Sequence, residues 1–343
     1  MSSQPRILAL ETSCDETAVA IVEGSRILAS EISSQVPLHR PFGGVVPELA
    51  SRNHVLHVAP LVRLALEHAQ CEIDDIDAFA ATSGPGLASS LLIGNTAAKA
   101  LAVSTGRPYL GINHMEGHLL SPFLSAGVEP CPCVGLVVSG GHTMLIQMDD
   151  VGSYTLLGCT RDDAAGEAFD KVGKMLELPY PGGPEIDKLA ASGNPNAYDF
   201  PRSMLHSGDF AFSFSGLKTS VLYQLPELRD GVPRDQRLPD ICASFQDAVV
   251  DILVGKAVKA LEATGLNCLA VSGGVACNSR LRTVMQERCE EASYRLLLPS
   301  PALTTDNAAM IGYVAALKFA QGFRSELTED VDPNLTLAAS PLS

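Results

Sequence analysis

The chain has 343 residues and a formal net charge of −15, because 39 Asp and Glu residues outnumber 24 Lys and Arg residues. Hydrophobic residues make up 46% and charged residues 18%, a globular composition that excludes a disordered chain. The length predicts about two domains, and no apolar run approaches the roughly 18 residues that cross a membrane. A pI of about 4.9 argues against a surface that binds nucleic acid everywhere, although a local basic groove stays open.

The N-terminus and the cysteines predict a cytoplasmic protein. Residues 1–6 lack the basic region, apolar run and cleavage site of a secretory leader. Nine scattered cysteines without a C-x-x-C pair are typical of reduced thiols. The one close pair, Cys131 and Cys133, is better explained as incidental than as a redox or metal site.

The first predicted elements are two strands joined by a polar loop. Residues 7–10 and 18–22 are apolar runs of strand length, and Glu11-Thr12-Ser13-Cys14-Asp15-Glu16-Thr17 lies between them. A third strand is predicted over 26–30, after a Gly-Ser turn.

This plan repeats in the middle of the chain. Strands are predicted over 134–138, 144–148 and 154–158, and the polar loop Ser139-Gly140-Gly141-His142-Thr143 joins the first two. Two such copies, about 125 residues apart, predict an internal duplication.

Helices dominate the remainder, and strands alternating with helices indicate the α/β class. The further predicted elements are helices over 55–69, 87–104, 162–176, 241–263, 278–289 and 306–322, and strands over 78–82 and 269–271. Asp306 is a natural N-cap for the last helix. The acidic segment 323–343 is predicted to be loosely ordered. Two related halves imply a cleft that binds a ligand.

The segment His114-Met115-Glu116-Gly117-His118 is the sharpest local signal. On a helix, His114 and His118 share one face and can chelate one metal. The segment is similar to the H-E-x-x-H of zinc proteases, but Glu116 is displaced by one position. A third ligand would be needed, usually a carboxylate, and Asp306 is one candidate that spacing alone cannot select. Two ordinary surface histidines remain the alternative.

Gly-rich turns form a second signal. Ser139-Gly140-Gly141, Gly182-Gly183 and Ser272-Gly273-Gly274 let a backbone approach a phosphate, and two of them follow apolar strands. Neither a P-loop nor a Rossmann pattern is present. Each turn alone is more often just a turn, but three in one chain favour a nucleotide.

Charged residues over 162–171 are a third signal. Asp162 or Asp163 is predicted to cap the following helix, and a solvated helix face explains the other charges without a function. On the functional interpretation, Asp170 binds a ribose hydroxyl with Asp187 nearby, and Asn278 contacts the nucleotide from the other domain. The segment 212–219 (FSFSGLKT) is a candidate nucleic-acid groove, but a plain edge strand is favoured.

Taken together, these motifs match one known family in order along the chain. The matching segments are Leu10 to Thr17, Gly43 to Arg52, His114 to His118, Val138 to Thr143, Asp162 to Lys171, Tyr180 to Pro184, Phe212 to Thr219 and Thr305 to Asn307. They resemble the tRNA threonylcarbamoyladenosine transferases of the bacterial TsaD type, and the resemblance runs from about residue 6 to about residue 322.

The resemblance implies a duplicated actin/hexokinase/Hsp70-like (ribonuclease H-like) α/β fold with two lobes around a nucleotide cleft. The lobes would be residues 1–125 with helix 306–322, and residues 126–305. The implied reaction transfers a threonylcarbamoyl group from threonylcarbamoyl-AMP to the N6 amine of the adenosine 3′ to the anticodon, in tRNAs that read ANN codons. AMP is the leaving group. A small-molecule kinase or ATPase of the same fold and a metallopeptidase are the alternatives, and a scaffold fits poorly.

Site residues carry over from the resemblance position by position. His114, His118 and Asp306 become ligands of one divalent metal, Fe²⁺ first and Zn²⁺ as the alternative. Glu11 and Glu16 lie beside the site and become candidate catalytic residues. The adenylate-binding positions become Val137, Val138, Ser139, Gly140, Gly141, Asp170, Gly183, Asp187 and Asn278.

The resemblance also implies partners. They are tRNA, threonylcarbamoyl-AMP, a silent paralogue of the same fold, a small P-loop ATPase that would use the ATP, and the enzyme that makes the adenylate. A homodimer is the alternative to pairing with the paralogue, and no membrane is involved. The C-terminus departs from the family pattern, because Glu329 to Leu335 is acidic and the chain lacks Trp, whereas relatives commonly end in a basic segment with Trp.

Overall fold

The computed structural model describes residues 4–224 and 234–337, and the chain divides into two compact units. Within the described residues, the first unit consists of 4–130 and 299–337, and the second unit lies between these segments in the sequence. The chain thus leaves the first unit at residue 130, where the sequence predicts 125, and returns at 299, where it predicts 306. Each unit has its own sheet and its own core.

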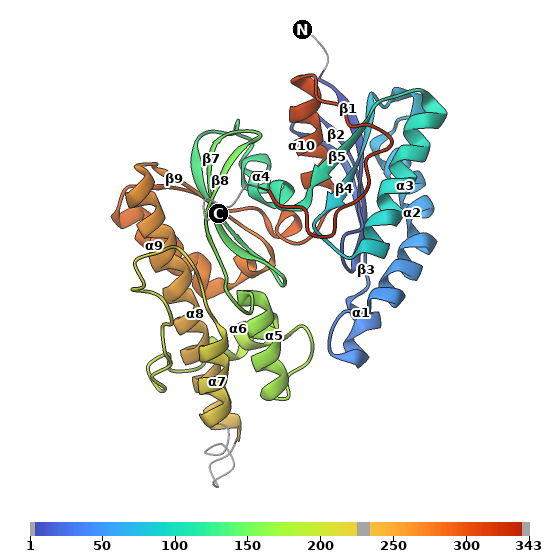
Figure 1. The fold of residues 1–343 in the computed structure, drawn as a ribbon. Helices are drawn as coiled ribbons and strands as arrows, with labels where there is room; N and C mark the ends of the chain where they lie inside the picture. Colours follow the sequence, from blue (N-terminus) through green and yellow to red (C-terminus); the bar gives the residue numbers. More distant parts are fainter. Residues whose placement is uncertain (1–3, 225–233, 338–343) are drawn as a thin grey trace. The chain divides into compact units, whose positions relative to one another are not determined.

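A mixed sheet forms the centre of the first unit (Figure 1). Its strands are β1 (Arg6–Glu11), β2 (Glu16–Glu23), β3 (Arg26–Ser34), β4 (Ala78–Gly84) and β5 (Tyr109–Asn113). Their order is β3-β2-β1-β4-β5, in which β1, β4 and β5 run parallel and the hairpin strands antiparallel. Because the carboxyl ends of parallel strands meet at one edge, Glu11 and Asn113 end their strands at the same edge of the sheet.

Helices cover both faces of this sheet. They are α2 (Pro47–Ala69), α3 (Ala88–Thr105), α4 (His114–Ala126) and α10 (Ala308–Ala320), whereas the four-residue α1 (Val36–His39) only follows β3. Figure 1 shows α2 and α3 on one face and α10 with α4 on the other, which explains why the apolar runs of β1 and β2 are buried throughout. The predicted helix over 55–69 is confirmed, and it begins earlier, at Pro47, where the missing proline N–H costs nothing.

The second unit repeats the sheet of the first. Its strands are β6 (Cys133–Val138), β7 (Thr143–Asp150), β8 (Ser153–Cys159), β9 (Cys268–Ser272) and β10 (Arg295–Leu297). The order β8-β7-β6-β9-β10 has the same antiparallel and parallel pairings as β3-β2-β1-β4-β5. The predicted duplication is therefore confirmed at the level of topology.

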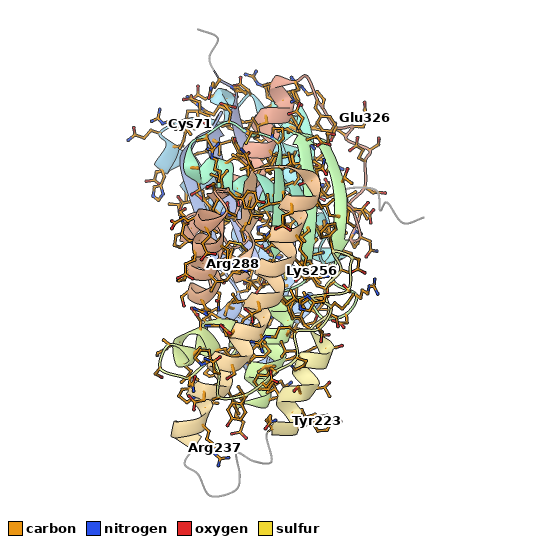
Figure 2. All side chains as sticks on the ribbon, turned by 90° about the vertical axis from the view of Figure 1, so that its left-hand side faces the viewer. Cys71, Tyr223, Arg237, Lys256, Arg288 and Glu326 are labelled. Atoms are coloured by element: carbon orange, nitrogen blue, oxygen red, sulfur yellow. The ribbon has the colours of Figure 1, made fainter. Side chains whose placement is uncertain are left out.

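The helices of the second unit pack around a buried hydrophobic core. They are α5 (Ala165–Met175), α6 (Gly182–Ala190), α7 (Ser215–Gln224), α8 (Arg234–Thr264) and α9 (Ser279–Glu291). α8 packs against β6, β7 and β9, and α6 and α9 pack against α8. Lys256 lies on α8 (Figure 2). Its side chain is fully buried, and its ammonium group donates to Ser207 Oγ at 2.9 Å and to the Asp209 carbonyl at 2.6 Å. These contacts offset the cost of burying the charge.

The favoured edge strand over 212–219 is wrong. Phe212 forms only an isolated bridge with Thr160, and helix α7 begins at Ser215. The alternating aromatic side chains suggest a strand, but Phe212 and Phe214 are both fully buried and stack at a centroid distance of 6.3 Å. Tertiary packing, which periodicity does not reveal, decides the conformation here.

The predicted capping of α5 by Asp162 or Asp163 is also wrong. α5 begins after Ala164 and has no side-chain cap. The Asp162 carboxylate instead accepts hydrogen bonds from the backbone N–H groups of Phe214 and Ser215, and so serves α7. An aspartate can satisfy the free amides of any nearby helix start, and here the nearest in space is not the nearest in sequence.

Part of the acidic C-terminal segment is bonded to the first unit. The Ser325 N–H donates to the Tyr109 carbonyl at 3.0 Å, and the Asp332 N–H donates to the Ser83 carbonyl at 2.8 Å. Over 323–337 this differs from the loosely ordered tail that composition predicts, because partners on β4 and β5 satisfy its backbone. Residues 338–343 lie outside the described residues.

Two general predictions can be compared with the structure. Among the described residues, no helix combines the length and apolarity required to cross a membrane. All nine cysteines are free thiols. Burial raises the pKa of the Cys242 and Cys268 thiols to about 12, so these two remain protonated at neutral pH.

Candidate metal centre

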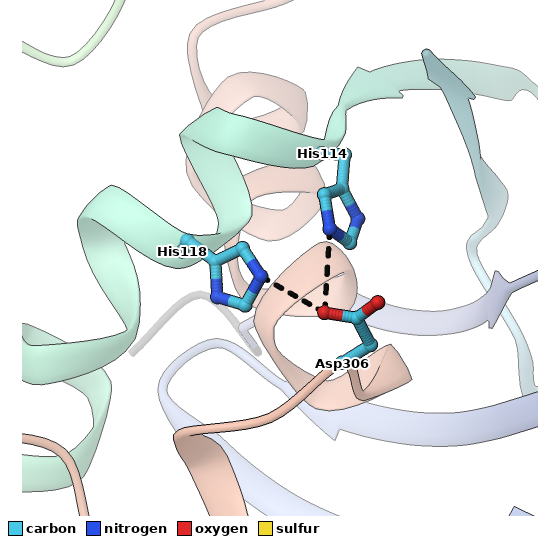
Figure 3. A group of neighbouring side chains, drawn as sticks. All are labelled: His114, His118 and Asp306. Carbon is cyan, nitrogen blue, oxygen red and sulfur yellow. Dashed lines mark hydrogen bonds and ion pairs between the residues drawn. The ribbon is translucent and has the colours of Figure 1, made fainter. Parts of the chain in front are cut away.

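Three side chains singled out in the sequence converge within the first unit (Figure 3). His114 and His118 lie one turn apart on α4, and Asp306 lies just before α10. Their nearest ligand atoms all lie within 4.8 Å of one another. Asp306 Oδ1 is 3.0 Å from Nε2 of His118 and 3.4 Å from Nε2 of His114. The structure thus places the carboxylate of Asp306 beside the two histidines, which spacing alone could not do.

The start of α4 sets the direction of the two imidazoles. The Asn113 side chain caps this helix by accepting hydrogen bonds from the N–H groups of Met115 at 2.8 Å and Glu116 at 3.3 Å. His114 is therefore the first helical residue, directly after β5. The two imidazole rings lie edge to face with centroids 4.7 Å apart, so both can face the same point.

Asp306 does not cap the last helix, and that prediction is wrong. The cap of α10 is Asn307, whose Oδ1 accepts from the Met310 N–H at 2.9 Å. Because the asparagine satisfies the helix start, the neighbouring carboxylate is free to face the two imidazoles. The sequence Asp306-Asn307 thus divides two roles between adjacent residues.

The buried charges of this group stabilise one another. Burial alone would raise the pKa of Asp306, but the charges and hydrogen bonds of His114 and His118 outweigh burial and hold that pKa well below its usual range. Burial alone would lower the pKa of His114, but the carboxylates of Asp306 and Glu11 raise it well above its usual value. A concentrated negative potential therefore faces the imidazoles, as expected of a cation-binding group.

The donor set fits a divalent metal. Two imidazole nitrogens and one carboxylate form the ligand set of catalytic zinc sites and of non-haem iron sites, which leave coordination positions open for substrate. Behind His114, the Glu11 carboxylate lies 2.9 Å from Nδ1, the arrangement common behind metal-bound histidines. The Nδ1 atom of His118 is buried and has no hydrogen-bond partner among the described residues.

The two candidate catalytic acids have different surroundings. Glu11 is fully buried at the end of β1, whereas Glu16 is partly exposed at the start of β2 and accepts from Ser34 Oγ at 3.0 Å. Burial, together with the charges of Asp306 and Asp15, raises the pKa of Glu16 to about 9. Glu16 therefore carries a proton at neutral pH when no cation is bound.

Glu116 does not belong to the metal-binding group. Its buried Oε2 lies 2.6 Å from Nζ of Lys318 on α10. The carboxylate is thus committed to an ion pair, and the general base that a metallopeptidase requires is not supplied by this residue.

The predicted nucleotide residues all belong to the second unit, where contacts link their segments. The prediction that Asn278 and Asp170 come from different domains is therefore wrong. Val137 and Val138 end β6, and the loop 139–141 follows. The Ser139 carbonyl accepts from the Gly166 N–H of α5 at 3.3 Å. A Cβ atom added at Gly140 or Gly141 would meet nothing within 4 Å, so the loop faces open space.

The remaining acidic positions connect α5, α6 and α9. Asp170 on α5 accepts from the Gly182 N–H at 2.7 Å, at the start of α6 beside Gly183. Asp187 on α6 accepts from Ser279 Oγ at 2.7 Å, at the start of α9. Hydrogen bonds therefore tie the start of α6 to α5 and the start of α9 to α6.

Sequence reasoning missed residues that hold these groups in place. Gln246 on α8 accepts from Asn278 Nδ2 at 2.7 Å, while Asn278 Oδ1 caps α9. In the first unit, Thr82 Oγ1 donates to Glu11 at 2.5 Å, and His54 on α2 lies 3.0 Å from the Cys14 carbonyl. None of these positions belongs to a local pattern, so only their spatial neighbours reveal them.

Solved structures share the architecture of the chain. HypF of T. kodakarensis aligns with a TM-score of 0.63 and 14% identity, covering 94% of this chain and 49% of HypF. Component A of the (R)-2-hydroxyglutaryl-CoA dehydratase of Acidaminococcus fermentans aligns with a TM-score of 0.54 and 17% identity, covering 92% of this chain and all of that one. At such identities the likeness shows the fold alone, which is the duplicated actin/hexokinase/Hsp70-like fold.

Closer relatives show the family. Residues 26–313 match the family model TsaD, tRNA N6-adenosine threonylcarbamoyltransferase. A relative of that name from Anaeromyxobacter sp. (strain Fw109-5) is 52% identical over 330 residues, covering 96% of this chain and 98% of the relative. Another, from Verminephrobacter eiseniae, is 49% identical over 342 residues, covering 97% and 99%. The chain therefore belongs to the tRNA N6-adenosine threonylcarbamoyltransferase family of the TsaD type.

Proposed function

We propose that this chain transfers a threonylcarbamoyl group from threonylcarbamoyl-AMP to the N6 amine of the adenosine 3′ to the anticodon, in tRNAs that read ANN codons. Family membership supports the reaction. The observation in the structure that carries it is the convergence of His114, His118 and Asp306 on one point. In the transfer, the carbonyl carbon forms a bond to N6, its bond to the phosphate oxygen breaks, N6 loses a proton, and AMP leaves.

The chemistry of the donor explains why no covalent nucleophile is required. The donor is a mixed carboxylic–phosphoric anhydride, which is already activated toward an amine. A divalent metal held by the two histidines and Asp306 would act as a Lewis acid toward carbonyl and phosphate oxygens. The adenine amine is a weak nucleophile, so the main task of the protein is to hold the amine close to the carbonyl carbon of the donor in the orientation needed for attack.

Glu16 is the better placed of the two acidic residues to contact substrate. It is partly exposed, and its pKa of about 9 leaves it protonated at neutral pH before a cation binds. A protonated carboxyl can donate a hydrogen bond to an anionic substrate oxygen, which an ionised carboxylate cannot do.

The adenylate is proposed to bind in the second unit. Successive N–H groups of the loop 139–141, which faces open space, can form an anion nest for the phosphate. Asp170 and Asp187 would accept hydrogen bonds from ribose hydroxyls, and Gly183 and Asn278 lie at the helix starts that these aspartates connect. Val137 and Val138 end β6 and lead directly into this loop, so they would form the floor of the same pocket.

The metal is proposed to be Fe²⁺, with Zn²⁺ as the alternative, and the compartment is proposed to be the cytoplasm.

Partners follow from the same proposal. A chain with a net charge of −15 is a poor autonomous tRNA binder, because phosphate contacts need Lys and Arg. A same-fold paralogue and a small P-loop ATPase would add basic surface and use ATP, and a homodimer is the alternative assembly.

The test is reconstitution with tRNA and threonylcarbamoyl-AMP, with and without the partner proteins, followed by mass spectrometry of the nucleosides. The wild-type chain should form threonylcarbamoyladenosine and release equimolar AMP. Asp306→Asn should abolish both, whereas Asp330→Asn, which changes an exposed tail residue, should not. ATP turnover without tRNA, and no modified nucleoside under any condition, would point to a kinase of the same fold instead.

A further inference from the structure

Glu11 is enclosed by protein on both of its carboxylate oxygens. It is the last residue of β1, and its side chain is fully buried. Oε1 accepts from the Ser13 N–H at 2.5 Å. Oε2 accepts from Thr82 Oγ1 at 2.5 Å and lies 2.9 Å from Nδ1 of His114. A substrate atom could reach this carboxylate only by breaking one of these contacts, so Glu11 is badly placed to act on substrate directly.

The order of the strands brings these partners together. β1, β4 and β5 are neighbouring parallel strands, and their carboxyl ends meet at one edge of the sheet. Glu11 ends β1, Thr82 lies near the end of β4, and Asn113 ends β5 immediately before His114. The contacts therefore come from the rigid part of the unit, which is the support that a precisely oriented ligand needs.

The contact with Glu11 determines which nitrogen of His114 is available. An ionised carboxylate only accepts hydrogen bonds, so Nδ1 of His114 carries the proton that Glu11 accepts. Nε2 is then the nitrogen that faces Asp306, whose Oδ1 is 3.4 Å away, and it is the one that a metal ion would use. His118 has no equivalent support, because its buried Nδ1 lacks a partner among the described residues. The two imidazoles are thus held differently.

We propose that Glu11 is a positioning residue, which holds His114 in the tautomer and ring orientation that bind the metal, and that Thr82 in turn holds Glu11. This inference rests on the metal centre proposed above, and it replaces the direct catalytic role expected of Glu11. Loss of a carboxylate behind a ligating histidine lowers metal affinity by about 10- to 100-fold. Thr82 acts one step further from the ion, so removal of its hydroxyl should have a smaller effect.

The first test measures Zn²⁺ affinity of the purified full-length chain by competition with a chelating indicator. Glu11→Gln should bind about 10- to 100-fold more weakly than wild type, and Thr82→Val should show a smaller loss. Glu116→Gln is the matched control, because it neutralises an equally buried carboxylate two residues from His114 that pairs with Lys318 instead. Its affinity should equal that of wild type.

A second readout separates positioning from general structural damage. In the Zn²⁺-loaded, ¹⁵N-histidine-labelled protein, the Nδ1–H signal of His114 is identified by its loss in His114→Ala. Glu11→Gln should move this proton signal upfield, because a neutral amide oxygen is a weaker acceptor than a carboxylate. The signals of the other histidines should stay in place.

Wild-type affinity together with an unchanged His114 signal in Glu11→Gln would overturn the inference. If Glu11→Gln does not fold, Thr82→Val becomes the deciding variant. Weaker Zn²⁺ binding at unchanged thermal stability supports the inference, and unchanged binding overturns it. A wild-type chain that binds no Zn²⁺ or Fe²⁺ overturns the metal centre itself, so the failure of the centre and the failure of the positioning role are distinguishable.

Discussion

Nε2 of His118 lies 3.0 Å from Oδ1 of Asp306, although 188 positions separate the two residues in the chain. Two asparagine caps make this contact possible. Asn113 starts α4 just before the first histidine, and Asn307 starts α10 just after the aspartate. Because each cap satisfies the free amides of its helix, neither His114 nor Asp306 is drawn into capping, and the two side chains meet at the same place.

Removal of the Asn307 cap should weaken both the helix and the metal centre. Asn307→Ala should lower the free energy of unfolding by about 1 kcal/mol and lower Zn²⁺ affinity, because Asp306 would then compete for the free amides of α10. Asn307→Asp, which keeps an acceptor at the cap position, should retain most of the stability. Chemical denaturation of the metal-free protein and chelator competition measure the two effects. Equal metal affinity in Asn307→Ala and wild type would contradict the division of roles.

Glu16 should tolerate an amide better than a truncation. If a protonated Glu16 donates a hydrogen bond to substrate, Glu16→Gln keeps a donor and should retain most of the transfer rate, whereas Glu16→Ala should lose about 100-fold, a typical contribution from a positioned group. Single-turnover rates of threonylcarbamoyladenosine formation at saturating tRNA provide the measurement. Equal losses in both variants would show that the ionised form is the active one.

Asp163 should make the stability of the second unit depend on pH. Burial alone would raise its pKa, but hydrogen bonds from Lys171 and Lys218 outweigh burial and lower it. A folded-state pKa below the unfolded value adds stability above the unfolded pKa, near 3.9, and this stability is lost as the pH falls through the folded value.

Asp163→Asn should therefore be less stable than wild type by about 1 kcal/mol at pH 7, because both lysines are partly exposed and the pairs are screened. This difference should persist down to about pH 5 and shrink below about pH 4. Urea denaturation followed across the pH range measures it. A difference that grows as the pH falls would have the wrong sign and would refute the assignment.

Truncation of the C-terminal segment should destabilise the first unit. A chain that ends at Gly322 loses the bond of Ser325 to β5, the bond of Asp332 to β4 and the bond of Pro333 to Gly86 in the turn after β4. At about 1 kcal/mol for each hydrogen bond, the loss should be about 2–3 kcal/mol. A chain that lacks only residues 338–343 is the matched control and should keep wild-type stability.

The truncation should in addition weaken metal binding, because Leu87, next to Gly86, donates to the Ser13 carbonyl at 2.8 Å and the Ser13 N–H donates to Glu11. Hydrogen exchange at the Gly86 amide, which donates to the Pro333 carbonyl, reports directly on the contact. Unchanged protection of that amide after truncation at Gly322 would show that the C-terminal segment does not stabilise the turn after β4.

The sequence by itself determined the elements that depend on local order. Apolar runs bounded by polar loops predicted the strands of both sheets, their repetition predicted the duplication, and the spacing of His114 and His118 predicted a shared helix face. The segment 212–219 shows the limit, because its alternating aromatic side chains suggested a strand, while burial of the aromatics and contacts with Asp162 produced helix α7.

Only the tertiary structure decided which distant groups meet. Nothing local shows whether Asp306 faces two histidines or caps a helix, or whether Glu11 is buried behind His114 or open to substrate. The order of β1, β4 and β5 places Glu11 behind His114, and the cap at Asn307 releases Asp306 toward His118. Periodicity records how a residue relates to its neighbours in sequence, whereas the roles of these carboxylates depend on which donors the packed sheet and helices bring within hydrogen-bond distance.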